Sequence, residues 1–386
     1  LCPILGPVFP PAKSLSTSSS FKTALASLQS QLQDAFKTGD SAHGPVGIND
    51  TYSIQIFSAA KKDLLFEQHH RGTNLAAETP IDGNSVYRVG SVAKMYTVYL
   101  LLLQSGDAIF SEPLTRYLPE LKGQSFWDEI TVGALAGQIG GVIADFTNRT
   151  IVYSVDSIAG GGLGAAFPGA FPLLEKNETS PCDANVTSCT RAEALEAWKA
   201  RGQVYLPNST PAYSNGAFVL LGFVVEAITG KTYEEAIQSL LIDPLKLRNT
   251  TSLVPKSTSG GVILLDETSS GWNIDLTAAA GMGSAFSSTS DLSAIGRSIL
   301  SSSLLHPNTT RAWLKPTSFT SSLIGAVGRP WEIFRASLDP ENNRVVDLYT
   351  KGGNIGVYAS LLALIPDFNV GFAVQAASLQ GANPTV

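Results

Sequence analysis

The sequence has few charged residues and no long apolar run. Only 15% of its 386 residues are charged and 44% are hydrophobic, a balance typical of a well-buried globular protein. The net charge of −6 comes without a basic stripe, which argues against a nucleic-acid partner. The longest apolar run, TVYLLLL at residues 97–103, is far too short to span a bilayer. We therefore expect one large globular domain or two smaller ones, with no membrane span.

Histidine is also scarce, which leaves little material for a metal centre. The four histidines stand at positions 43, 69, 70 and 306. Adjacent residues of a strand point to opposite faces, so the pair at 69 and 70 cannot bind one ion together. The GGGLG stretch at 160–164 lacks the lysine of a phosphate-binding loop. The sequence thus predicts neither a metal nor a cofactor.

Only three cysteines occur, and two of them lie close together in a polar segment. A short disulfide between Cys182 and Cys189 would suit an oxidising compartment, with two free thiols as the alternative, and Cys2 is left over. Seven N-x-[ST] sequons exceed the roughly three expected by chance, which favours a glycosylated protein. Residue 1 is Leu, so we expect that the start was removed and that the protein is secreted. The sequons are at Asn49, Asn148, Asn177, Asn185, Asn208, Asn249 and Asn308.

The order of the predicted elements indicates the fold class. After an extended, Pro-rich lead-in (1–20), residues 21–40 predict a helix that ends near Gly39, and 52–70 predict two strands. Residues 91–305 are mostly helical in pattern, with buried helices at 91–106 and 215–230 and further helices at 231–245 and 287–302. Three strands follow, at 344–350, 356–366 and 369–378. We therefore predict one domain over 21–386, an α/β protein of the α+β type. Its antiparallel sheet would come from 21–90 and 306–380, and its helical lobe from 91–305.

The stretch YRVGSVAKMYTVYLLLLQSGD places Ser91 three residues before Lys94. A serine hydroxyl needs a neighbour that takes its proton, and a lysine one helical turn away lies on the same face. Burial would lower the pKa of Lys94 and let it accept that proton. The spacing alone is not specific, because it also occurs at Ser19 and at Ser58. A helix-capping Ser91 with Lys94 directed to solvent is the alternative.

Two later stretches supply the context that this spacing lacks. PAYSNGAF puts Tyr213 and Asn215 just before a predicted buried helix, and LYTKGGNIGVYASLL puts Lys351 between two late strands. Serine-x-x-lysine, tyrosine-x-asparagine and lysine-x-glycine in this order resemble the serine β-lactamase and penicillin-binding-protein superfamily. The closest likeness is to its class C and esterase-like branch, particularly to fungal secreted members, and it covers about residues 49–378. A literal KTG at 37–39 precedes the serine and is rejected for that reason.

The resemblance implies a β-lactamase/transpeptidase-like fold with a metal-free site between the sheet and the lobe. Ser91 would be the acylated nucleophile, and Lys94 and Tyr213 would move its proton in an order that the sequence leaves open. Asn215 would hydrogen-bond Lys94 and the substrate carbonyl. Lys351 would add positive potential. The resemblance also implies a further C-terminal domain or helix beyond residue 386.

The same resemblance assigns the substrate-binding strand. The backbone N–H groups of Ser91 and Asn354 would form the oxyanion hole, and Gly352 and Gly353 would let substrate lie against the strand edge. Gly352 departs from the usual threonine or serine of this motif, which weakens the case for a β-lactam or cell-wall substrate. The family's H-T-S-G stretch appears here as LAGQIGG, so Gln138 either lines the site or is a solvated side chain in a turn.

These observations predict a secreted serine hydrolase that acts through an acyl-Ser91 intermediate on an ester, an amide or a lactam. Its partner would be a small-molecule or peptide substrate. One alternative is an acyltransferase or cyclase of small-molecule biosynthesis that uses the same acyl-enzyme. Another is a catalytically silent binding module on the same fold. Retention of two lysines beside one tyrosine favours an enzyme over a scaffold.

Overall fold

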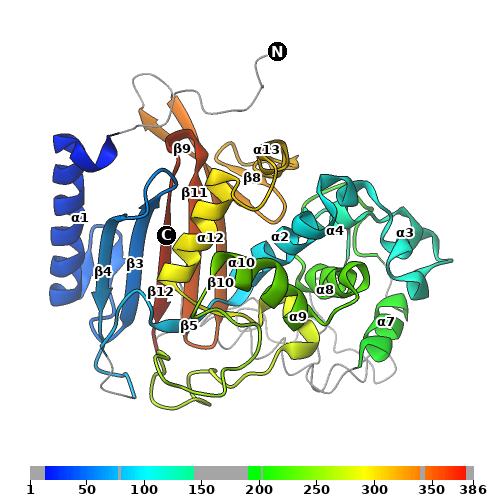
Figure 1. Cartoon of the computed structure of the whole chain (residues 1–386), viewed down its shortest axis with the longest axis horizontal. Coiled ribbons are helices and arrows are strands. Elements are labelled where there is room, and N and C mark those ends of the chain that lie inside the picture. The colour runs from blue at the N-terminus through cyan, green and yellow to red at the C-terminus, as the bar shows by residue number, and fades with distance from the viewer. Residues whose placement is uncertain (1–13, 77–79, 143–189, 201–202, 340–343, 380–386) are drawn as a thin grey trace.

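The computed structural model describes residues 14–76, 80–142, 190–200, 203–339 and 344–379, built around one antiparallel sheet (Figure 1). The sheet has eight strands in the order β4-β3-β12-β11-β10-β9-β8-β7. β3 pairs with β12, so segments from the two ends of the chain lie side by side, which confirms the predicted fold class. The strands are β3 (Thr51–Ser58), β4 (Leu64–His70), β7 (Ser318–Phe319), β8 (Gly325–Val327), β9 (Glu332–Asp339), β10 (Arg344–Ile355), β11 (Tyr358–Ile365) and β12 (Val370–Ala377). Two short pairs stand apart, β1 (Asp40–Ser41) with β2 (Gly44–Pro45) and β5 (Val86–Arg88) with β6 (Phe286–Ser288).

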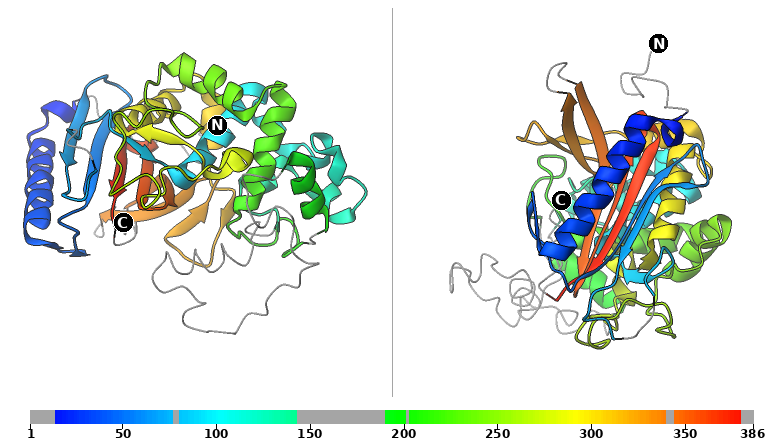
Figure 2. Two further views of the ribbon diagram at one scale, coloured as in Figure 1. Left: turned by 90° about the horizontal axis from the view of Figure 1, so that it is seen from below. Right: turned by 90° about the vertical axis from the view of Figure 1, so that its left-hand side faces the viewer.

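One helix covers each face of the sheet. α1 (Ser19–Thr38) packs Phe36 against Tyr52 of β3, with ring centroids 4.3 Å apart. Side chains alternate between faces along a strand, so Phe57 of β3 points to the opposite face, toward α12 (Thr289–Ser301). Figure 2 shows the blue α1 and the yellow α12 on opposite sides of the sheet.

The position of α12 corrects the predicted division of the chain. The sequence predicts a helical lobe over residues 91–305, but α12 packs on the sheet. Its buried residues Leu292, Ile295 and Ile299 recur at helical spacing and form one apolar stripe. Gly296 lies on the same side, where an added Cβ would stand 2.3 Å from the ring of Phe57. Hydrophobic burial against the sheet therefore decides where this helix lies.

Most of the remaining helices lie beside the sheet and form the helical lobe, while α13 lies next to β8 (Figure 1). α8 is the central one, and ten of its residues are buried. None of the helices in the described ranges is long and apolar enough to cross a membrane alone. α8 with α9 and α10 reaches that length and composition only as a pair bent by 71°. The helices are α2 (Ala93–Ser105), α3 (Ser125–Glu129), α4 (Val132–Ala136), α7 (Arg191–Ala200), α8 (Asn215–Thr229), α9 (Tyr233–Ile237), α10 (Asp243–Leu245), α11 (Ala280–Gly283) and α13 (Pro307–Trp313).

Several predicted helix ends are confirmed. Each of them is determined by a residue at the end itself, a left-handed glycine or a capping serine. α1 ends at Gly39 and α8 at Gly230, both left-handed, with φ of 77° and 65°. α8 begins after Ser214, whose side chain accepts a hydrogen bond from the N–H of Ala217. The helix predicted to open at Ser91 instead begins at Ala93, because a 3₁₀ turn precedes it.

Two further predictions are wrong in detail. The single helix expected over 231–245 is divided into α9, a π turn (Gln238–Ile242) and α10, which contains Pro244. Lys351 was expected between two strands, but it lies inside β10, opposite Leu362 of β11. The strand continues through Gly352 and Gly353 because backbone pairing with β11 needs no side chain.

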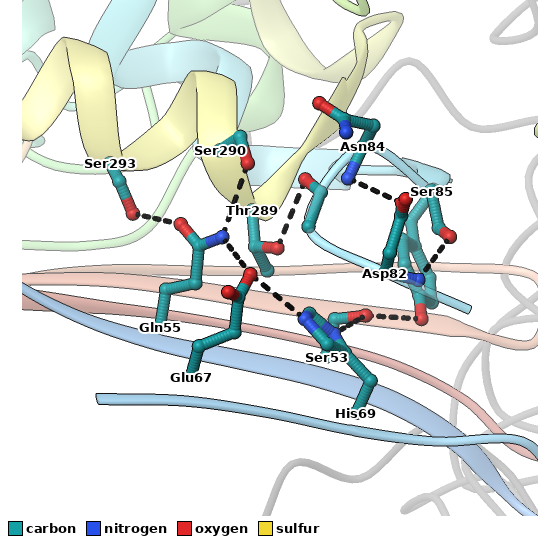
Figure 3. Close-up of polar contacts among 12 residues, drawn as sticks. Ser53, Gln55, Glu67, His69, Asp82, Asn84, Ser85, Thr289, Ser290 and Ser293 are labelled. Carbon is teal, nitrogen blue, oxygen red and sulfur yellow. Dashed lines mark hydrogen bonds and ion pairs between the residues drawn. The ribbon is translucent and has the colours of Figure 1, made fainter. Parts of the chain in front are cut away.

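A network of hydrogen bonds links β3 and β4 to α12 (Figure 3). Gln55 of β3 donates from Nε2 to Oε1 of Glu67 at 2.7 Å and to Oγ of Ser290 at 3.1 Å. Its Oε1 accepts from Oγ of Ser293 at 2.9 Å. Gln55 is buried, so these bonds satisfy a side chain that would otherwise be costly inside the protein.

Some of the cysteines and sequons on which the prediction of secretion rests lie outside the described residues. This applies to Cys2, Cys182 and Cys189 and to three of the sequons, at Asn148, Asn177 and Asn185. The other four sequons are described. Asn49, Asn208 and Asn308 are exposed, and Asn249 is half-buried.

Candidate active site

Ser91 lies where the lobe meets the sheet, in a 3₁₀ turn (Gly90–Val92) just before α2. A Cβ on Gly353 of β10 would stand 2.2 Å from the carbonyl oxygen of Val89 and 2.5 Å from the N of Ser91. A Cβ on Gly90, which has a φ of 51°, would stand 2.8 Å from the N of Asn354. The serine turn and β10 thus touch backbone to backbone, and only glycine fits on either side. This contact brings the N–H groups of Ser91 and Asn354 into one small region.

Lys94 is fully buried beside the serine. Its Nζ donates to Oγ of Ser91 at 2.9 Å, to Oδ1 of Asn215 at 2.6 Å and to the carbonyl oxygen of Met282 at 2.7 Å. Three acceptors match the three donors of an ammonium group. The predicted alternative, in which Lys94 points to solvent, is therefore wrong.

Tyr213 contacts the same serine oxygen. Its hydroxyl lies 2.7 Å from Oγ of Ser91 and is the donor of that hydrogen bond, while the side chain stays 45% exposed. Nζ of Lys94 lies 5.0 Å from the centre of the tyrosine ring, and Nζ of Lys351 lies 5.4 Å from it. Both lysine nitrogens therefore lie within cation–π distance of one ring. Among the sequence-predicted residues, Lys94, Tyr213 and Asn215 meet at the serine, and Lys351 joins them through this ring.

Gln138 holds the segment that carries Tyr213. It is buried, has a φ of 61°, and accepts from the backbone N–H of Ser214 on its Oε1 at 2.8 Å. Its own carbonyl oxygen accepts from the N–H of Ala212, also at 2.8 Å. The solvated glutamine of the predicted alternative is thus ruled out. A substrate contact by Gln138 stays a prediction, and the structure gives this residue a positioning role that sequence reasoning missed.

Lys351 has a partner that the sequence analysis did not single out. Its Nζ lies 2.6 Å from Oε1 of Glu332, and Oε2 of the same carboxylate accepts from the N–H of Gly352 at 3.1 Å. Burial lowers the pKa of Lys351, and the neighbouring Glu332 opposes that shift. Glu332 was missed because it belongs to no motif of the stretch AVGRPWEIF, and only the pairing of β9 with β10 brings it to the site.

A serine–histidine–carboxylate set lies on the outer strands, away from Ser91 (Figure 3). Nδ1 of His69 lies 2.9 Å from Oγ of Ser53, and Nε2 of His69 lies 3.0 Å from Oε1 of Glu67. Ser53 has no exposed surface and also bonds the buried Tyr87 hydroxyl at 3.0 Å. A substrate cannot reach that serine, so the set belongs to the network around Gln55. Within the described ranges, no group of three His, Cys, Asp or Glu side chains could hold a metal ion.

Comparison with known proteins gives the family. Residues 59–385 match the family model described as Beta-lactamase. A β-lactamase-like protein of Arthroderma benhamiae is 33% identical over 97% of this chain and 63% of its own length. A probable hydrolase of Phoma sp. is 26% identical over 90% of the chain and 58% of its own length. The chain therefore spans about three fifths of the length of these relatives.

Solved structures agree on the fold. A D-stereospecific amidohydrolase from Streptomyces sp. superposes with a TM-score of 0.64 at 21% identity, covering 92% of this chain and 96% of its own. A class C β-lactamase gives a TM-score of 0.65 at 16% identity, covering 94% and 93%. At such identities the likeness establishes the β-lactamase/transpeptidase-like fold, whereas the family model and the sequence relatives establish descent. This chain belongs to the β-lactamase family.

Proposed function

We propose that this chain is a serine hydrolase that forms a covalent acyl intermediate on Ser91 and then transfers the acyl group to water. One observation carries the proposal: Oγ of Ser91 lies within hydrogen-bond distance of two groups that can move its proton, Nζ of Lys94 and the hydroxyl of Tyr213. Membership of the β-lactamase family and the hydrolase names of the fungal relatives support it.

The proposed reaction balances with the groups at hand. Oγ of Ser91 attacks the carbonyl carbon of an ester, amide or lactam, and the bond to the leaving group breaks. The serine proton passes to whichever of Lys94 and Tyr213 is deprotonated, and from there to the leaving group. The N–H groups of Ser91 and Asn354 would stabilise the oxyanion. Water then attacks the carbonyl carbon of the acyl-serine, the same groups pass one proton of that water to Oγ of Ser91, and the bond to Oγ breaks to release the carboxylic acid.

The direct test is intact-protein mass spectrometry after exposure to a fluorophosphonate, an activated phenyl ester and a penicillin. We expect one adduct per chain on the wild type, none on Ser91→Ala, and an unchanged adduct on Ser19→Ala, the matched control from another S-x-x-K. Absence of any adduct on folded wild-type protein would favour the silent binding module. Adding an amine or alcohol to the ester assay distinguishes acyl transfer from hydrolysis, because transfer yields a new amide or ester.

We also propose that the protein is secreted and N-glycosylated. The excess of sequons supports this, as does the exposure of Asn49, Asn208 and Asn308. Expression through a eukaryotic secretory pathway should give protein that loses mass on enzymatic removal of N-glycans. Protein that reaches the medium with no glycan on any of the seven asparagines would contradict the proposal.

A further inference from the structure

Glu332 places a carboxylate over Lys351 of β10, the strand that we expect to bind substrate. Its two oxygens contact two neighbouring donors of β10: Nζ of Lys351 at 2.6 Å and the N–H of Gly352 at 3.1 Å. Nζ of Lys351 also donates to the carbonyl oxygen of Gly352 at 2.7 Å. These two donors, which would otherwise bind an anion, are therefore already engaged by an anion of the chain itself.

The exposure of the pair decides which charge a substrate meets. The side chain of Lys351 is 2% exposed, whereas that of Glu332 is 43% exposed. Thr350 holds the backbone of Glu332 in place. The two residues lie opposite each other in the pairing of β9 with β10, and the carbonyl oxygen of Glu332 accepts from Oγ1 of Thr350 at 2.6 Å. A substrate that approaches this part of β10 therefore meets the carboxylate and not the ammonium.

The glycine at 352 adds to the effect. A Cβ placed there would have only Oε2 of Glu332 within 4 Å, at 3.6 Å, so space is open where a threonine or serine would stand. A glycine offers no hydroxyl to a substrate carboxylate, and its N–H is occupied by Glu332. Shape and charge together leave room for a substrate group but no donor for an anionic one.

We propose that Glu332 determines substrate specificity. It selects substrates that carry a positive charge on the part that lies beside β10, accepts neutral ones less well, and rejects those with a carboxylate there. The attraction is that of an exposed carboxylate for a cation, and the rejection is like-charge repulsion at a position where Lys351 is covered. This inference rests on the proposed acylation of Ser91.

The test compares phenyl esters that are neutral, carry a carboxylate or carry a quaternary ammonium. The charge is placed on the phenol in one series and on the acyl chain in another, and each rate is divided by the ester's hydroxide-catalysed rate. In at least one series we expect kcat/KM to fall from cationic to neutral to anionic ester. Glu332→Gln keeps the shape of the side chain but loses its charge. It should reduce the ratio of kcat/KM for the cationic ester to that for the anionic ester about tenfold, which corresponds to about 1.4 kcal/mol. Glu234→Gln on the exposed side of α9 is the control and should leave the ratio unchanged.

Three outcomes separate the possible failures. Hydrolysis that persists in Ser91→Ala would overturn the proposed function. Hydrolysis that depends on Ser91, but shows no charge preference in either series or the same preference in Glu332→Gln, would overturn only the role of Glu332. Labelling of Ser91 by a neutral fluorophosphonate shows whether the variant is folded. If the variant is not folded, the wild type is tested by salt instead. Its cation-to-anion ratio must decrease as the salt concentration is raised from about 10 mM to about 500 mM, because screening weakens an exposed charge contact. A constant ratio would overturn the inference.

Discussion

The hydroxyl of Tyr213 lies 2.7 Å from Oγ of Ser91, although 122 residues separate the two in the sequence. The contact exists because the first two thirds of α8 is buried, which fixes the segment just before it against the serine turn. Lys94 reaches the same oxygen from inside the lobe. The serine is therefore held between an exposed phenol and a buried amine, and the two can be tested separately.

Tyr213→Phe removes one of these contacts with little effect on packing. Because the side chain is 45% exposed, the free energy of unfolding should change little, while ester turnover should fall by about 10²–10⁴-fold. Steady-state kinetics and thermal melting measure the two effects. Tyr205→Phe, at a tyrosine that is 47% exposed, is the control and should keep full activity. A Tyr213→Phe enzyme within a few-fold of the wild type would show that the phenol is not needed.

Lys94→Met should impair both stability and activity. The methionine fills similar space, but it leaves the carbonyl oxygen of Met282 and Oδ1 of Asn215 without their buried donor. Each lost partner costs about 1–3 kcal/mol of the free energy of unfolding. Urea denaturation measures that loss, and the fluorophosphonate rate reports the activity.

Ser91→Ala is the comparison for that variant, because it removes the nucleophile and leaves Lys94 its other two acceptors. We expect Ser91→Ala to be inactive but close to wild-type stability. Lys94→Met that is as stable as the wild type, or that labels at the wild-type rate, would contradict the buried hydrogen bonds assigned here.

Gln138 should act on the reaction through the backbone of Ser214. Gln138→Ala removes the acceptor of that N–H, so the segment bearing Tyr213 should lose its position and kcat should fall more than KM changes. Gln138→Glu keeps a side-chain oxygen at the same place and should recover most of the loss. If Gln138→Ala turned over at the wild-type rate, this hydrogen bond would not position Tyr213.

A structural feature of this protein could be predicted from the sequence where the interaction that determines it is local. Gly39 and Gly230 end their helices through their own backbone freedom, and Ser214 caps α8 three residues away, so these ends could be predicted. The order of the three motifs also indicated which serine to choose. α12 was placed wrongly because an apolar stripe does not say which surface it packs against.

The same limit explains what was missed at the site. Glu332 and Lys351 are brought together by the register of β9 against β10, where Glu332 lies opposite Thr350, and nothing near either residue encodes that register. The role of Gln138 rests on a backbone N–H of a segment 76 residues away. Both contacts follow from the fold, so a motif that names only side chains cannot reveal them.

Adding a methyl group should be harmful at Gly353 and harmless at Gly352, the two glycines that follow Lys351. A Cβ at Gly353 would stand 2.2 Å from the carbonyl oxygen of Val89 and 2.5 Å from the N of Ser91, both of them backbone atoms. Gly353→Ala must therefore push β10 away from the serine turn, and we expect a loss of about 1–3 kcal/mol of stability and of nearly all labelling of Ser91. Gly352→Ala meets only Oε2 of Glu332 at 3.6 Å, an ordinary contact, and should fold and label like the wild type. Melting temperatures and labelling rates of the pair decide the matter, because equal behaviour of the two variants would mean that β10 does not approach Ser91 as closely as described.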